Sequence, residues 1–148
     1  MTTTPTVRPL VAADLDGISR VHWRACRIAY RFMSWSYSLD EVRIWYAGKL
    51  EEWDWAQVVT VDGVIVAFLA ASGAHLDQLF VDPDYQGAGV GGLLLEAMLE
   101  RHPGPLTLHV HAGNQPARRF YERFGFRPVG SLWDAQDEAR KLVYRLDR

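Results

Sequence analysis

Four glycines within six residues make one short stretch of this sequence suited to bind an anion. Gly87, Gly89, Gly91 and Gly92 follow an apolar run that ends at Asp82-Pro83-Asp84, and an apolar helical pattern then continues to Arg101. Glycine lets a ligand approach the backbone closely. The first N–H groups of a helix have no partner within the helix and carry partial positive charge. We therefore expect a phosphate or a pyrophosphate to bind at this turn.

Two common phosphate-binding patterns fit the turn poorly. Gly87, Gly89 and Gly92 match the G-x-G-x-x-G pattern of dinucleotide-binding domains, but Asp82–Gln86 separate the first glycine from its strand. That pattern also needs an acidic residue about twenty residues further on, where this sequence has His109 to His111. A Walker phosphate loop requires Gly-Lys-Ser or Gly-Lys-Thr, which the turn lacks.

The elements that must position this turn follow from local sequence patterns. Runs of β-branched and apolar residues predict strands at Thr6–Leu10, Trp55–Val61, Val64–Ser72, His75–Val81, Leu106–Val110, Phe126–Leu132 and Lys141–Leu146. Helical spacing predicts helices that start near Asp14, start at Ser38 and run to about Leu50, span Gly91–Arg101, and span Asn114–Phe124. Because strands and helices alternate in the second half, we expect an α/β protein with a mixed sheet.

Composition narrows the class of protein. The 148 residues carry a formal net charge of −2, and 49% are hydrophobic, which is typical of one globular domain, here residues 1–148. A dedicated nucleic-acid binder usually has a clear basic excess. The single cysteine, Cys26, excludes an internal disulfide and argues against thiolate zinc sites. The N-terminus has no apolar core of the signal-peptide kind, and the longest apolar run, Val64–Ala71, is too short to span a membrane. We therefore expect a cytoplasmic protein.

The glycine turn also resembles the coenzyme A signature of the GNAT superfamily of N-acetyltransferases. That signature is Gln/Arg-x-x-Gly-x-Gly/Ala, and Gln86, Gly89 and Gly91 fill its defined positions. A second stretch, Asn114 to Phe126, reads Asn-x-x-Ala-x-x-Phe-Tyr-Glu-x-x-Gly-Phe and looks like the second motif of the family. The order of the expected elements is similar as well. The resemblance implies the GNAT acyl-CoA N-acyltransferase fold, with a central splayed sheet flanked by helices.

The resemblance implies acetyl-CoA as co-substrate and no metal. The coenzyme pyrophosphate would then lie on the backbone of Gln86, Gly87, Ala88, Gly89, Val90, Gly91 and Gly92. The pantetheine arm would pair with the strand that ends at Val81 and would contact Asn114. The thioester would lie between that strand and the strand that ends at Val110. Backbone N–H groups near Phe80 and Val81 would stabilise the tetrahedral oxyanion.

The same resemblance implies direct attack by an amine in a ternary complex, without an acyl-enzyme. Attack on a thioester expels a thiolate, and Tyr121 matches the family tyrosine that often serves as general acid. The amine must also lose a proton before it attacks. The two-residue period of a strand places His75, Asp77, Leu79 and Val81 on one side, so His75 is a candidate base. Asp77 is either a base or a ligand for a cationic acceptor. Both residues are equally compatible with ordinary strand positions.

Aromatic residues point to the acceptor. Tyr30, Phe32, Trp35 and Tyr37 occupy the connection between the first two helices, which walls the acceptor site in the resembling family. A cationic primary amine, in a small molecule or a peptide, would bind on such aromatic faces. His109 and His111 are two residues apart, but the sequence places no obvious third ligand beside them, so no metal is expected.

Other function classes fit part of the pattern. A non-catalytic acyl-CoA-binding module would share the fold, and the presence of Tyr121 argues against it. A nucleotide-dependent oxidoreductase conflicts with the spacing of the glycines. Neither nucleic acid nor a membrane is expected as a partner, and the sequence allows a homodimer. It does not identify the acceptor.

Overall fold

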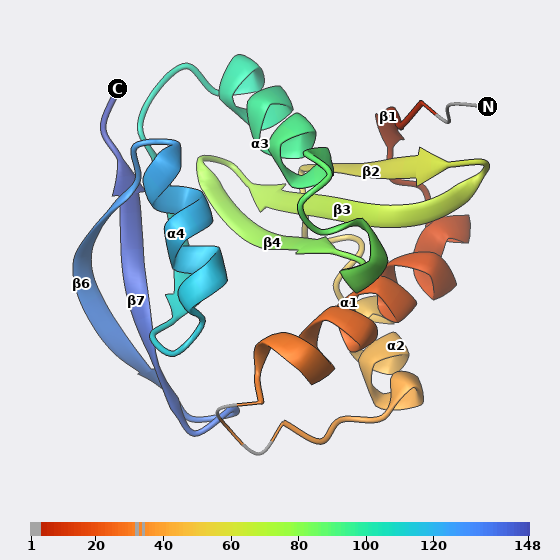
Figure 1. Ribbon diagram of the computed structural model, residues 1–148, viewed down its shortest axis with the longest axis horizontal. Helices are drawn as coiled ribbons and strands as arrows, with labels where there is room; N and C mark the ends of the chain where they lie inside the picture. Colours follow the sequence, from red (N-terminus) through yellow and green to blue (C-terminus); the bar gives the residue numbers. More distant parts are fainter. Residues whose placement is uncertain (1–3, 32, 34) are drawn as a thin grey trace.

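One open sheet organises the computed structural model, which describes residues 4–31, 33 and 35–148 (Figure 1). Within that part of the chain, its strands lie in the order β1-β2-β3-β4-β5-β7-β6. They are β1 (Thr6–Pro9), β2 (Trp55–Val61), β3 (Val64–Ser72), β4 (His75–Val81), β5 (Leu106–His111), β6 (Arg127–Asp134) and β7 (Ala139–Leu146). Only β4 and β5 pair in parallel among these strands, and the other neighbours are antiparallel. The expected mixed sheet is therefore confirmed.

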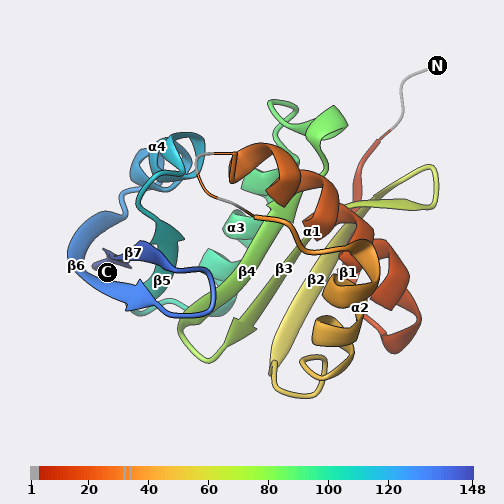
Figure 2. The ribbon, with the colours of Figure 1, turned by 90° about the horizontal axis from the view of Figure 1, so that it is seen from below.

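Helices cover both faces of the sheet, as Figure 2 shows. They are α1 (Leu15–Ala29), α2 (Leu39–Ala47), α3 (Val90–Arg101) and α4 (Gln115–Arg123), with short 3₁₀ turns η1 (Ala12–Asp14) and η2 (Pro83–Tyr85). One apolar cluster joins α1 and α2 to the sheet through Phe68, and a second joins α3 and α4 to it through Leu69. None of the helices in the described ranges is long and apolar enough to cross a membrane.

Local signals in the sequence predicted most element boundaries correctly. Asp62 and Gly63 have φ angles of 53° and 77°, as the tight turn between β2 and β3 requires. Ser38 and Glu41 form the expected capping box at the start of α2. Four helix ends differ from expectation. The α2 helix ends at Ala47 rather than near Leu50, α3 begins at Val90, one residue early, and α4 is one residue shorter at each end than predicted.

A β-bulge in β4 corrects one expectation. The consecutive β3 residues Ala71 and Ala70 pair with Leu76 and Gln78. Asp77 lies between these two pairs and is therefore an extra residue in β4. As a result, Leu76 packs in the same apolar cluster as Leu79 and Val81. The prediction that His75 and Asp77 share one side with Leu79 and Val81 is wrong, because a strict two-residue period does not continue through a bulge.

The sheet splays between β4 and β5. These strands pair only at His75 with Thr107 and at Leu76 with Leu108, after which they diverge. The predicted splay near the middle of the sheet is thus confirmed. Each strand keeps its other neighbour, β3 for β4 and β7 for β5. All the strands belong to one sheet, and a single domain over residues 1–148 stays our prediction.

Candidate active site

Two cavities meet where β4 and β5 diverge. The first, of about 440 Å³, lies between α1, α2 and the connection of β6 to β7, and we call it the aromatic cavity. The second, of about 250 Å³, lies between β4, β5 and α4, and we call it the strand cavity. Residues that line both mark their junction, and they are Tyr30, Gln78, Phe80, His111 and Lys141.

The glycine turn lies directly after β4 and opens to solvent. Gly87 and Gly89 have φ angles of 81° and 84°, a conformation that other residues rarely adopt. Gln86 to Gly89 are exposed, and Gly89 is the N-cap of α3. Gln86 donates a hydrogen bond from Nε2 to the Val81 carbonyl oxygen at 3.1 Å. The backbone N–H groups at the start of α3 are therefore held at the end of β4, as an anion site requires.

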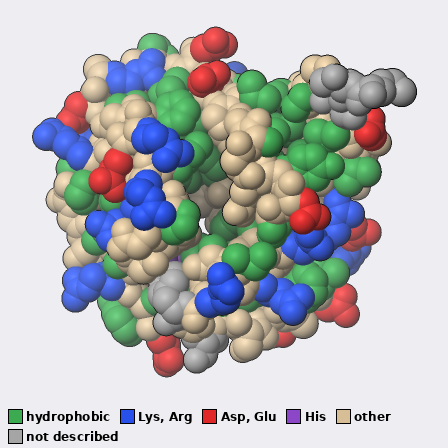
Figure 3. Space-filling view, in the orientation of Figure 1, with side chains coloured by type: hydrophobic (Ala, Val, Ile, Leu, Met, Phe, Trp, Pro, Cys, Tyr) green, Lys and Arg blue, Asp and Glu red, His purple; other side chains and the backbone are tan. Residues whose placement is uncertain are grey.

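An ion-pair network anchors this turn to α1. Arg24 on α1 donates from Nε to Asp82 Oδ2 at 2.9 Å and from Nη2 to Asp84 Oδ2 at 3.0 Å. Asp82 is buried and also accepts a bond from the Asp84 backbone N–H. The sequence pattern identified Asp82-Pro83-Asp84 only as the end of a strand. In Figure 3 the surface is hollowed between α4 and β4, with Lys and Arg side chains on both sides.

The strand cavity contains two residues of the second motif. Tyr121 on α4 is buried, and burial raises the pKa of its phenol well above the usual value. The hydroxyl therefore keeps its proton at neutral pH. Asn114 lies at the N-terminus of α4, where its Oδ1 accepts a bond from the Ala117 N–H at 3.3 Å. Phe80 contributes to the opposite wall of the same cavity.

His75 and Asp77 line the strand cavity but not the aromatic cavity. The Nδ1 atom of His75 lies 2.7 Å from Oγ1 of Thr107, and its Nε2 atom lies 3.7 Å from Asp77 Oδ1. Asp77 also accepts a hydrogen bond from the Ser72 hydroxyl. Both side chains thus bond to neighbouring strand residues at the closed end of the splay.

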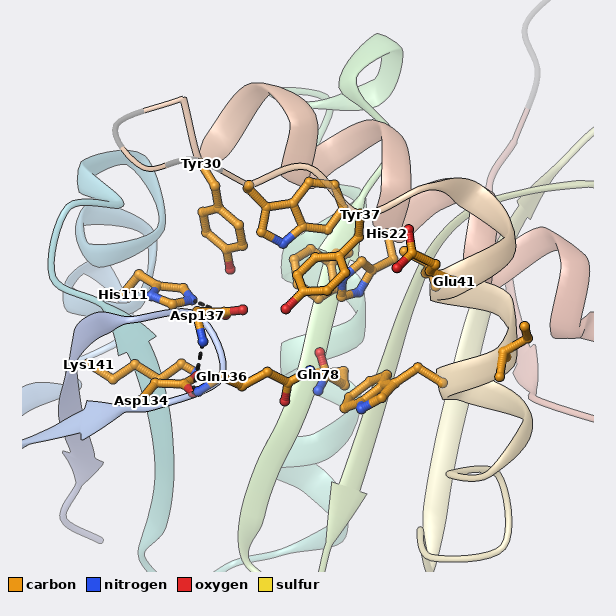
Figure 4. A pocket seen from close by; sticks show the side chains of 15 residues that line it. His22, Tyr30, Tyr37, Glu41, Gln78, His111, Asp134, Gln136, Asp137 and Lys141 are labelled. Carbon is orange, nitrogen blue, oxygen red and sulfur yellow. Dashed lines mark hydrogen bonds and ion pairs between the residues drawn. The ribbon is translucent and has the colours of Figure 1, made fainter.

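The aromatic cavity includes three of the four aromatic residues expected at the acceptor site. Tyr30, Trp35 and Tyr37 line it, and Figure 4 shows the rings of Tyr30 and Tyr37 beside the open space. Phe32 lies outside the described residues. Trp23 on α1 donates from Nε1 to the Tyr37 carbonyl oxygen at 3.1 Å, which fixes the connection between α1 and α2.

Carboxylates that the sequence reasoning missed also line the aromatic cavity. They are Glu41 on α2, Asp134 at the end of β6, and Asp137 in the connection to β7 (Figure 4). Glu41 could have been noticed, since it belongs to the capping box beside the predicted aromatic wall. The two aspartates lie outside both family motifs, so no local signal marked them.

Asp134 and Asp137 lie beside His111, contrary to the expectation that no carboxylate lies near this histidine. His111 Nε2 is 3.1 Å from Asp137 Oδ2, and Lys141 Nζ is 2.8 Å from Asp134 Oδ2. Burial lowers the pKa of His111, Lys141 lowers it further, and Asp137 opposes them. The ring is therefore neutral at pH 7. The Lys141 ammonium supplies positive charge beside these carboxylates.

Comparison with known proteins agrees with this geometry. Residues 20–126 match the model of the acetyltransferase (GNAT) family. Peptidyl-lysine N-acetyltransferase YiaC of Escherichia coli K12 is 34% identical over 107 residues, which cover 72% of this chain and 68% of YiaC. The chain belongs to the GNAT acetyltransferase family, which argues against the dinucleotide-binding alternative.

Two further proteins extend the similarity. Peptidyl-lysine N-acetyltransferase YjaB of E. coli K12 is 45% identical over 65 residues, so the matched sequence spans only 44% of that relative. The solution structure of apo YjaB has a TM-score of 0.80, with 28% identity, and covers 96% of this chain and 97% of that one. The PaiA N-acetyltransferase of Thermoplasma acidophilum, solved with coenzyme A, has a TM-score of 0.76 and 19% identity over 98% of this chain and 99% of that one.

A pH-dependent stability follows from His22, which lines the aromatic cavity and bonds through Nδ1 to the Tyr46 hydroxyl. Burial lowers its pKa to about 3. Below pH ~6.5 the His22 ring is protonated in the unfolded chain but not in the folded protein. The free energy of unfolding therefore decreases as the pH is lowered, by up to about 1.4 kcal/mol per pH unit. Denaturant unfolding between pH 7 and 4.5 should show a shallower slope for His22→Gln. Equal slopes for the variant and the parent would contradict this assignment.

Proposed function

We propose that this protein transfers an acetyl group from acetyl-CoA to the primary amine of a small molecule or peptide. The observation that carries the proposal is the pair of joined cavities where β4 and β5 diverge, with the exposed glycine turn directly after β4. Family membership supports the reaction class. Two of the relatives are named as peptidyl-lysine N-acetyltransferases, which supports an amine acceptor.

Coenzyme A would bind along the open edge of β4. Its pyrophosphate would accept hydrogen bonds from the backbone N–H groups of residues 86–92, without a charged side chain being needed. Beyond Leu76, the β4 edge that faces β5 lacks a strand partner in the described ladder. The amide groups of an extended pantetheine arm supply the missing partners, as an added strand would. Asn114 lies across the strand cavity, where its side chain would contact the arm.

The thioester would then lie beside Tyr121. Backbone N–H groups near Phe80 and Val81 would stabilise the negative oxygen of the tetrahedral intermediate. When that intermediate collapses, the C–S bond breaks and the Tyr121 hydroxyl gives its proton to the departing thiolate. The raised pKa of Tyr121 keeps the proton available, and the thiolate in this buried site is a stronger base than in water.

The acceptor amine would enter through the aromatic cavity. Aromatic rings attract a cation by roughly 0.5–2 kcal/mol, depending on desolvation. Glu41 and Asp137 add negative charge to the same cavity. The acceptor is therefore expected to arrive as an ammonium ion and to lose a proton before attack. Direct transfer in a ternary complex needs no acyl-enzyme, and we propose no metal. A cytoplasmic location and a homodimer stay predictions from the sequence.

Exchange of Gly89 tests the anion site. Aspartate and asparagine have nearly the same shape and both tolerate positive φ, so Gly89→Asp and Gly89→Asn differ chiefly in charge. Repulsion between the aspartate and a pyrophosphate a few ångströms away is of order 1 kcal/mol or above. Acetyl-CoA should therefore bind the aspartate variant about tenfold more weakly than the asparagine variant. Calorimetric titration measures both affinities. Equal dissociation constants in the two folded variants would exclude pyrophosphate binding at this turn.

Removal of the Tyr121 hydroxyl tests the proton donor. Tyr121→Phe should retain acetyl-CoA affinity and lower kcat by about 10²–10⁴-fold, the usual range for general acid catalysis. Thiol release from acetyl-CoA in the presence of a primary amine measures the turnover. Tyr144→Phe is the matched control, because this buried hydroxyl bonds to Arg118 and Glu122 outside both cavities. Unchanged kcat in the Tyr121 variant would assign the proton transfer to another group.

A further inference from the structure

The base that activates the amine must face both reactants. The amine enters through the aromatic cavity, and the thioester would lie in the strand cavity. Three titratable side chains line both cavities, namely Tyr30, His111 and Lys141. Tyr30 keeps its proton because burial raises its pKa. Lys141 is paired with Asp134 and cannot accept a proton as an ammonium. His111, with a neutral ring, is the one member of these three that can.

His75 is placed less well for this role than the sequence suggested. It lines the strand cavity alone, and its Nδ1 atom bonds to Thr107 next to the paired end of β4 and β5. His109 also lines only the strand cavity. An amine held in the aromatic cavity would therefore meet His111 before it met either of these rings.

His111 also has a carboxylate beside it that would stabilise the imidazolium form of the ring. Its Nε2 atom lies 3.1 Å from Asp137 Oδ2, and Asp137 lines the aromatic cavity. Figure 4 shows the Asp137 carboxylate between His111 and the aromatic side chains. The Tyr30 ring packs edge-on against the imidazole, with ring centroids 4.5 Å apart. An ammonium held by this carboxylate would lie beside Nε2.

We propose that His111 and Asp137 together form the base that takes the proton from the acceptor ammonium, an assignment that rests on the proposed acetyl transfer. For this step the ring carries its proton on Nδ1, and the ammonium replaces the Nε2–H as the donor to Asp137. One N–H bond of the ammonium then breaks and an N–H bond forms at His111 Nε2, which leaves the electron pair on the amine. That pair attacks the thioester carbonyl carbon. The new imidazolium donates to the Asp137 carboxylate. The thiolate takes a proton from Tyr121, and the second proton that leaves the nitrogen as the amide forms restores the Tyr121 hydroxyl. His111 returns its proton to water.

The charged groups around His111 set the balance between its neutral and its protonated form. Asp134 at the end of β6 and Asp137 in the connection to β7 favour the imidazolium, and Lys141 from β7 opposes it. Tyr30 from the end of α1 is neutral, and so is the buried thiol of Cys26, whose pKa is raised by burial and by Asp137. Removal of the Asp137 charge should therefore make the imidazolium harder to form.

Kinetics of His111→Gln and Asp137→Asn test the proposal in the full chain. Acetyl transfer is followed as thiol release with a panel of primary amines that includes a single-lysine peptide and a polyamine. At pH 7, we expect His111→Gln to lower kcat/KM about 10²-fold or more. Asp137→Asn should lower kcat/KM as well. His102→Gln, at the end of α3 and outside both cavities, controls for the loss of a histidine. Acetyl-CoA affinity should be retained in all three.

The pH profile separates a base from a structural residue. Without the base, His111→Gln can use only amine that is already neutral in solution. The neutral fraction rises tenfold per pH unit below the amine pKa of about 10.4. The defect of His111→Gln should therefore shrink by up to about tenfold per unit between pH 7 and 9. It should also shrink at pH 7 with a weakly basic fluorinated alkylamine. A merely structural defect would be the same at every pH and with every amine.

Each outcome decides a different point. If the parent binds acetyl-CoA but acetylates no amine in the panel, the proposed function fails and the base assignment fails with it. If the parent is active and both variants keep kcat/KM within about twofold, or lose it equally at all pH values, the base assignment alone is wrong. If His111→Gln does not fold, the pH profile of Asp137→Asn gives the same decision.

Discussion

β4 and β5 share backbone pairing at only two residue pairs before they diverge, and the rest of the site depends on that separation. Burying backbone N–H and C=O groups without hydrogen-bond partners destabilises the fold. A gap between parallel strands is therefore stable only beside water or a ligand. The bulge at Asp77 lies just beyond the last paired residue, and α4 packs on the far side of the strand cavity. The gap is thereby kept open, and we propose that it is a slot for an extended amide-bearing ligand.

The two ends of this slot carry opposite electrostatic character. At one end, the exposed turn before α3 offers backbone N–H groups to an anion, and Arg24 holds that turn in place through Asp82. At the other end, carboxylates and aromatic rings suit a cation. Burial between them keeps Tyr121 protonated and His111 neutral. The protein without its ligands therefore already holds the protonation states that acetyl transfer to an ammonium requires.

Sequence reasoning succeeded where a structure is determined by neighbouring residues. The Asp62-Gly63 turn, the Ser38 cap and the glycine turn each depend on backbone preferences within a few residues. It failed at the Asp77 bulge, since an extra residue in a strand is visible only in its pairing. It also missed Asp137, because β7 lies between β5 and β6 in the sheet, and only that strand order brings the connection of β6 to β7 beside His111. The roles of the site residues stay predictions until they are tested.

Binding of acetyl-CoA in the open splay is the central claim, and backbone amide NMR tests it most directly. Titration of the ¹⁵N-labelled protein with acetyl-CoA should shift the amide signals of Leu79–Val81 and of Gln86–Gly92 together. Signals from β1 and β6, at the two edges of the sheet, should stay in place. Saturable binding that left residues 79–81 and 86–92 unchanged, or no binding at all, would contradict the account.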